Sequence, residues 1–220
     1  MDIFSINETR LDASISNNEL NIPGYVLFRK DRSRTGGGVC LYIRNVLNVI
    51  DRVKDIPSNL EAVCFELIKP KFKPLLVTTV YRPPSSGSDL MDLFETYLLT
   101  LDKEDKELIV PGDLNCDLSL RFLQPHSNRL TEILSLFQLE QVITDPTRVT
   151  STHESLLDII ATNRPDKLLN SGVLHIGISD HSLVYACFKI AVPKQNPKFI
   201  ESRTFKHNNQ EYLIEISRIC

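Results

Sequence analysis

An acid and an amide stand two residues apart in ELIVPGDLN, residues 107–115. A short apolar run leads into Gly112, and Asp113 and Asn115 follow it. Side chains two apart at a strand end point the same way, so both would face the space beyond the edge of a sheet, where ligands bind in open α/β folds. Taken alone, the pattern favours a functional site about as much as an ordinary Asx-turn.

Other residues capable of chemistry also follow apolar runs. His181 follows Asp180 in ISDH, and a histidine beside a carboxylate suits proton transfer or phosphate binding; the plainer alternative is a surface histidine capped by aspartate. Glu8 follows IFSI, and a carboxylate there could bind a hard cation such as Mg²⁺, although an isolated glutamate is more often solvated. Tyr81 is a polar aromatic residue where an apolar run ends.

Asp158 lies inside the apolar run LLDII. A buried carboxylate is costly unless it is paired, and His181 is the obvious partner. Each of these side chains stands at or near the end of a predicted core strand. Converging strand ends would assemble one site from distant parts of the chain.

The elements that must position these residues alternate between strands and helices. Apolar residues at helical spacing predict helices over 88–101, with Ser88 as the N-cap, and over 129–137. Many strands with few helices indicate two sheets packed face to face with helices outside. Strands are expected at residues 1–7, 25–29, 38–43, 62–68, 74–81, 107–111, 157–162, 172–178 and 183–189.

Composition limits the classes of protein. The chain has 220 residues, 42% apolar and 24% charged, with a formal net charge of −3, so a nucleic acid would have to meet a local basic surface. Five cysteines without CxxC or zinc spacing indicate free thiols. No signal peptide and no run of ~18 apolar residues predict a soluble, intracellular protein. Basic residues in predicted loops could contact phosphates: Arg29, Lys30, Arg32, Arg34, Lys69, Lys71 and Lys73.

Taken in order, ETRL, GGGV, YRPP, GDLN, LDII and SDH resemble the endonuclease/exonuclease/phosphatase superfamily. Over about residues 1–190 the chain looks most like the apurinic-endonuclease-like nuclease domain of non-LTR (LINE-type) retrotransposons, and IPGYVLFRKDRSRTGGGVCLYIR is typical of them. The resemblance implies an α/β (α+β) fold, a four-layer sandwich of two mixed sheets with outer helices. It also implies Mg²⁺-dependent phosphodiester hydrolysis, with Mn²⁺ as an alternative cofactor and DNA nicking as the reaction.

The same resemblance implies a role for each residue. Glu8 would bind the metal, and Asp180 would help to orient the metal or the nucleophile. Asp113 would orient or deprotonate the attacking water, which Asn115 would position.

Tyr81 would hold the scissile phosphate, and His181, kept in place by Asp158, would stabilise the developing charge. Contacts to the substrate are implied at Asn115, Thr147, Ser155 and Arg82.

The chain departs from the family at both ends. The family places a strand with a metal-binding asparagine, and then a helix, ahead of the strand that carries Glu8, so we expect the N-terminal strand and helix to be missing. Residues 191–220 resemble a linker toward a reverse transcriptase that is absent here, with a short amphipathic segment at Gln210–Ile219.

The expected partner is the DNA phosphate backbone, with no membrane, and the protein is expected to be a monomer that is nuclear when it acts on DNA. Two alternatives stay open. One is a catalytically impaired, truncated remnant that at most binds nucleic acid. The other is a phosphatase or another phosphodiesterase of the same superfamily.

Overall fold

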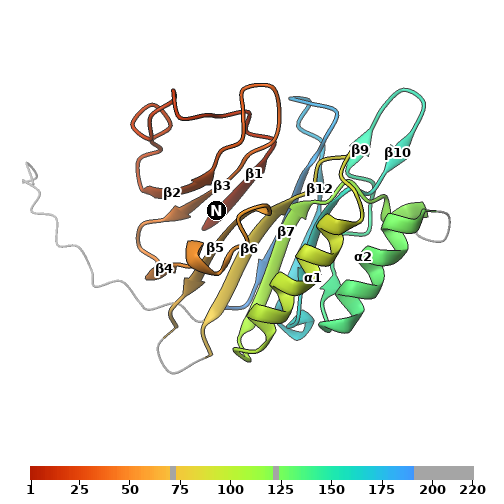
Figure 1. The fold of residues 1–220 in the computed structure, drawn as a ribbon. Coiled ribbons are helices and arrows are strands. Elements are labelled where there is room, and N and C mark those ends of the chain that lie inside the picture. The colour runs from red at the N-terminus through yellow and green to blue at the C-terminus, as the bar shows by residue number, and fades with distance from the viewer. Residues whose placement is uncertain (70–72, 121–123, 191–220) are drawn as a thin grey trace, which may run out of the picture.

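A mixed sheet forms the centre of the molecule (Figure 1), and the computed structural model describes residues 1–69, 73–120 and 124–190. Its six strands lie in the order β4-β5-β6-β7-β11-β8, and β6 and β7 are parallel while the other neighbours are antiparallel. The strands are β4 (Val49–Asp51), β5 (Glu61–Leu67), β6 (Leu75–Tyr81), β7 (Glu107–Asp113), β11 (Asp158–Thr162) and β8 (Glu140–Gln141).

Smaller sheets complete the β-structure. The order β1-β3-β2 forms one sheet and β12-β13 forms another, while β9 and β10 make a short hairpin beside the central sheet. Their bounds are β1 (Ile3–Asn7), β2 (Tyr25–Lys30), β3 (Val39–Arg44), β9 (Arg148–Val149), β10 (Glu154–Ser155), β12 (Leu168–Leu174) and β13 (Leu183–Phe188). Short 3₁₀ turns are η1 (Val53–Asp55), η2 (Leu118–Leu120) and η3 (Pro165–Lys167).

Two helices, α1 (Asp89–Asp102) and α2 (Pro125–Leu136), lie side by side on one face of the central sheet (Figure 1). Along β6 the side chains alternate between two cores. Leu76 and Val80 belong to the core shared with the helices, whereas Leu75 and Val77 belong to the core beneath the β1-β3-β2 sheet. A strand buried on both faces is apolar throughout, which is why β6 appears in the sequence as a continuous apolar run.

The predicted α/β architecture with mixed sheets is confirmed, with shifts at several boundaries. The strand expected over 172–178 runs instead over Leu168–Leu174, because the apolar Ile176 and Ile178 are exposed in a loop. Ser88 stands at the N-cap position of α1 as predicted, but it has helical dihedral angles and its side chain makes no capping hydrogen bond. The second helix begins earlier than expected, at Pro125, a residue that suits the first helical turn.

The inner face of β7 is incompletely covered. Ile109 and Pro111 are only half buried although β7 lies inside the sheet. Over this face, β1 packs on β6 and β7 while β13 packs on β11, and within the described residues neither β1 nor β13 has a partner on its second edge. The expected absence of an N-terminal strand and helix stays a prediction, and the predicted tail 191–220 lies outside the described residues. Neither helix, nor any other in the described ranges, is long and apolar enough to cross a membrane.

Candidate active site

Three of the predicted site residues lie side by side at one edge of the central sheet. Asp113 is the last residue of β7, Tyr81 is the last residue of β6, and the two are partners in the parallel ladder. Asp158 is the first residue of β11 and pairs with Asp113 in the antiparallel ladder. Partners in a ladder point to the same face of the sheet, so the strand ends place the phenol and both carboxylates together.

His181 joins this group from the loop between β12 and β13. Its Nδ1 lies 2.9 Å from the Oδ2 of Asp158, so the predicted pair is present. The loop is held from both sides of the histidine, because Arg148 forms a β-bridge to His181 and the Ser182 N–H donates to the Thr147 carbonyl at 2.7 Å. The hydrogen bond to Asp158 raises the pKa of His181 above its usual 6.5, against the opposing effect of burial.

The carboxyl group of Asp113 is the most perturbed acid of the site. It is only 5% exposed, and burial, followed by the negative charge of Asp158, raises its pKa to about 7, although the Asn115 N–H donates to it. That bond joins the Asn115 nitrogen to Oδ1 of Asp113 at 2.9 Å. A carboxyl group with a pKa near neutrality can both accept and release a proton at that pH, as a general base must.

Glu8 lies against the same residues from the end of β1. The Tyr81 hydroxyl donates a hydrogen bond to Oε1 of Glu8, and burial together with this bond raises the pKa of Tyr81. Glu8, Arg10 and Asn115 have φ angles of 53°, 52° and 48°. Left-handed dihedral angles are uncommon for residues other than glycine and cluster at functional sites, and here they occur where the chain turns off β1 and β7.

Asn115 and Arg82 hold the loop after β7. The Asn115 side chain donates to the Arg82 carbonyl at 2.8 Å. The Arg82 side chain is fully buried and donates to the carbonyls of Leu114, at 3.4 Å, and Ser86, at 2.8 Å. Arg82 therefore supports the loop from behind, and the substrate contact expected of it does not fit this burial.

Thr147 has a positioning role that the sequence did not indicate. It is fully buried, and its hydroxyl oxygen accepts the N–H groups of Leu157, at 3.1 Å, and Asp158, at 3.0 Å. These bonds fix the start of β11 and therefore the Asp158 carboxylate. Ser155 is also buried, on β10, so neither of the two presents an exposed hydroxyl to a substrate.

Asp180 is turned toward Arg148, whose Nε lies 2.6 Å from Oδ2 of Asp180. The hydrogen bond from Arg148 lowers the pKa of this carboxyl group, and Asp180 is not a member of the compact group of ligand atoms described below. The expected contact of Asp180 with a metal therefore lacks support from the geometry.

Several of the basic residues expected to contact phosphates are used within the fold. Lys69 is buried in an ion pair with Glu107, and Arg29 pairs with Asp31 at 3.2 Å. The Lys30 ammonium group donates to three backbone carbonyls before β5. Lys71 lies outside the described residues. The phosphate-binding expectation for these side chains was wrong for Lys69, because its charge is neutralised inside the protein.

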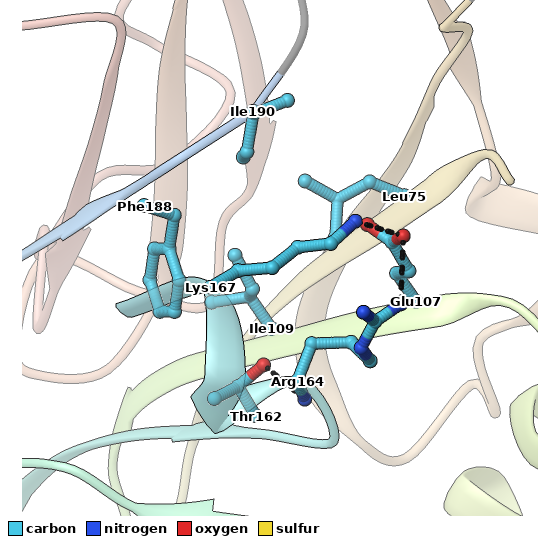
Figure 2. Close-up of a pocket in the computed structure, with 8 residues that line it drawn as sticks. All are labelled: Leu75, Glu107, Ile109, Thr162, Arg164, Lys167, Phe188 and Ile190. Carbon is cyan, nitrogen blue, oxygen red and sulfur yellow. Dashed lines mark hydrogen bonds and ion pairs between the residues drawn. The ribbon is translucent and has the colours of Figure 1, made fainter. Parts of the chain in front are cut away.

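A small pocket surrounds Glu107 at the other end of β7 (Figure 2). Arg164, at 3.2 Å, and Lys167 reach the Glu107 carboxylate from η3, and Phe188 and Ile190 line the opposite side. Because Glu107 begins β7 and Asp113 ends it, this pocket is remote from the acidic cluster. We assign it to the ion pairs that stabilise the fold.

The carboxylates of the site fit a hard divalent cation. One atom each of Asp113, Asp158 and His181 lie within 4.8 Å of one another, and the two carboxylates among them offer oxygen ligands while the His181 ring stays bonded to Asp158. Glu8 adds a further carboxylate, which is close enough for its negative charge to help raise the pKa of Asp113. Carboxylate oxygens are the preferred protein ligands of Mg²⁺. A cation would oppose the effects of burial and of the Asp158 charge, which together raise the pKa of Asp113.

A comparison with family models identifies the family of the chain. A family model described as "Endonuclease-reverse transcriptase" matches residues 75–185, just over half of the chain. The chain belongs to this family, within the endonuclease/exonuclease/phosphatase superfamily. No curated protein gives a significant match.

Solved structures share the fold at low sequence identity. The endonuclease domain of TRAS1, a telomere-specific non-LTR retrotransposon, is 15% identical with a TM-score of 0.68, and the match covers 86% of each chain. The Xenopus laevis APE2 catalytic domain is 16% identical with a TM-score of 0.64, covering 88% of this chain and 86% of that one. The 3′ phosphatase NExo from Neisseria, bound to a product DNA hairpin, is 16% identical with a TM-score of 0.63, covering 86% and 89%.

Proposed function

We propose that the protein hydrolyses phosphodiester bonds of DNA with the help of Mg²⁺, as a nicking endonuclease. The observation that carries this proposal is the meeting of Asp113, Asp158 and His181, with ligand atoms within 4.8 Å of one another, beside the hydrogen-bonded pair of Tyr81 and Glu8. Attack on a phosphodiester needs an activated water, a Lewis acid and a positive charge near the phosphate oxygens, and the cluster offers a group for each.

The protein side chains divide this work. The buried carboxylate of Asp113 would take a proton from the attacking water, since burial matches its pKa to neutral pH. The imidazolium of His181, favoured by Asp158, would lie against the phosphate oxygen that gains charge. Glu8 and the neighbouring carboxylates would hold Mg²⁺, or Mn²⁺, which supplies the Lewis-acid chemistry when bound.

DNA is the substrate that the comparisons favour. One structural neighbour is a retrotransposon endonuclease and another is bound to a DNA hairpin. The chain has a net charge of −3, so phosphate contacts must come from local cations, and the exposed Arg10 lies next to Glu8. A protein that nicks chromosomal DNA acts in the nucleus, and the proposal includes that location and a monomeric state.

A nicking assay tests the proposal directly. Supercoiled plasmid incubated with the full chain and Mg²⁺ is expected to convert to the open-circular form, and chelation with EDTA should stop the conversion. His181→Gln should reduce the rate by at least about 10²-fold, the size of one lost group that stabilises the transition-state charge. Asp105→Asn is the matched control, because this aspartate side chain is 89% exposed and lies away from the cluster.

A panel of substrates separates the alternatives. Release of phosphate from a 3′-phosphorylated hairpin without plasmid nicking would assign a phosphatase activity, as the name of the Neisseria neighbour indicates for that protein. DNA binding with no Mg²⁺-dependent cleavage of any panel member would contradict the hydrolytic proposal and leave the interpretation as an impaired remnant.

A further inference from the structure

We infer that Arg32 is a positioning residue of this site: its guanidinium group fixes the Tyr81 ring so that the phenol can bind Glu8. The inference deepens the proposed function and rests on it for its catalytic consequence. The guanidinium carbon lies 5.9 Å from the centroid of the Tyr81 ring. A cation over an aromatic face at this distance is attracted by the ring quadrupole.

The position of Arg32 is set by further contacts. Its Nε donates to the Gly36 carbonyl at 2.9 Å, and its NH1 donates to Oε1 of Glu61 at 2.7 Å. Glu61, the first residue of β5, pairs in register with Tyr81 across the β5–β6 ladder. The carboxylate that holds Arg32 therefore lies on the strand next to the phenol that Arg32 covers.

The glycine loop before β3 leaves room for this arrangement. Gly37 has a φ of +72°, and a Cβ atom there would lie 2.2 Å from Nε of Arg32 and 2.6 Å from Oε2 of Glu61. The Gly38 N–H donates to the same Oε2 of Glu61 at 2.6 Å. The space beside Gly37 is thus occupied by the guanidinium group, and any side chain there would displace it.

The same loop also holds the backbone around Glu8. The Thr9 and Arg10 N–H groups donate to the carbonyls of Gly38, at 3.2 Å, and Gly37, at 2.9 Å. These bonds fix a segment in which Glu8 and Arg10 have positive φ angles. The unit formed by Arg32, Glu61 and the glycine loop therefore supports both partners of the hydrogen bond between Tyr81 and Glu8.

Loss of Arg32 would remove two contacts at once. The face of the Tyr81 ring would lose its cation, and Glu61 on the neighbouring strand would lose its ion-pair partner. We expect the ring to reorient and its bond to Glu8 to weaken.

Two separate measurements test the inference: the NMR signal of the Tyr81 ring, and the kinetics of nicking. In protein labelled with [¹³Cζ]tyrosine, with the Tyr81 resonance assigned by Tyr81→Phe, Arg32→Gln and Gly37→Ala should both shift or broaden that resonance. Gly24→Ala is the matched control: Gly24 has a φ of +88°, so alanine is strained there as well, but a Cβ atom meets nothing within 4 Å. Arg32→Lys, which keeps the charge without the planar guanidinium group, serves if Arg32→Gln does not fold.

In the nicking assay, Arg32→Gln and Gly37→Ala should lower kcat about tenfold, equivalent to about 1.4 kcal/mol at the upper range of a cation–π contact, while KM changes less than twofold. An unchanged Tyr81 resonance in a folded Arg32 variant would overturn the inference. So would a rise in KM with kcat intact, because that result would make Arg32 a direct substrate ligand. The resonance reports on the phenol even if no nicking is seen, so failure of the proposed function and failure of this inference are distinguishable.

Discussion

Replacing Asp113 with asparagine should abolish hydrolysis and, in metal-free protein, stabilise the fold at neutral and alkaline pH. The pKa of Asp113 is raised from 3.8 to about 7. Between these values the unfolded chain has already lost the proton and the native protein has not, so the free energy of unfolding falls as the pH rises. At about 1.4 kcal/mol for each pKa unit, the full penalty is about 4 kcal/mol.

Asparagine has nearly the shape of aspartate, and its carboxamide oxygen can still accept the Asn115 N–H bond that Oδ1 of Asp113 accepts at 2.9 Å. The variant therefore keeps the geometry and escapes the charge penalty. Urea denaturation in EDTA at pH 5 and pH 8 measures the effect. The free energy of unfolding of the variant, minus that of the native sequence, should rise by about 3 kcal/mol from pH 5 to pH 8. This is the part of the full penalty that falls between these two pH values.

Asp105→Asn provides the comparison for this experiment. Its side chain is 89% exposed, and its φ of 47° suits asparagine as well as aspartate, so its stability should follow that of the native sequence at both pH values. If Asp113→Asn also loses stability in parallel with the native sequence, Asp113 does not hold a proton at neutral pH and the raised pKa inferred for it is wrong. Adding Mg²⁺ should favour the native sequence over Asp113→Asn, because a cation bound to the native state stabilises it.

Three further outcomes follow from contacts described above. Asp158→Asn should lower the pKa of His181, since the bond to Asp158 is the main cause of its rise; NMR titration of the ring detects this, and an unchanged pKa would contradict it. In the native protein, the pair of Asp158 and His181 should contribute its full stabilisation below pH 6.5. This contribution should be lost as the pH rises through the raised pKa that His181 has in the folded protein. Asp158→Asn should not show this loss. Thr147→Val should cost about 1–3 kcal/mol in urea denaturation, because two buried N–H groups lose their acceptor; a change below about 0.5 kcal/mol would show that they find other partners. Glu107→Gln should cost about 3–5 kcal/mol, since the buried Lys69 would lose its carboxylate partner, whereas wild-type stability would show that this ion pair contributes little.

The central sheet and much of the cluster were predictable because their signals are local. Strand β7 is a largely apolar run that ends at an acid. Leu108 and Val110 lie in the core beneath the helices, and Ile109 packs, half buried, on the opposite face. Asp158 stood out as a carboxylate inside an apolar strand, and the need for a partner led to His181. These inferences use burial and periodicity, which a sequence records directly.

Other features depended on partners far along the chain. The run of lysines at residues 69–73 resembles a solvated loop, and nothing near it shows that Lys69 meets Glu107 in the interior. The two isoleucines of HIGISD resemble part of a strand in the sequence, although both are exposed. The role of Thr147 depends on the register of β11, and the role of Arg32 depends on a ring from another sheet, so neither could be inferred from spacing.

The meeting of Glu8 with residues of β6, β7 and the loop at His181 also has a consequence for biosynthesis. Long-range contacts of this kind form late, because the intervening chain must first be ordered. A nascent chain that has emerged only as far as β7 holds Glu8, Tyr81 and Asp113 but neither Asp158 nor His181. The proposed site would therefore be complete only after the loop that carries His181 has emerged and folded.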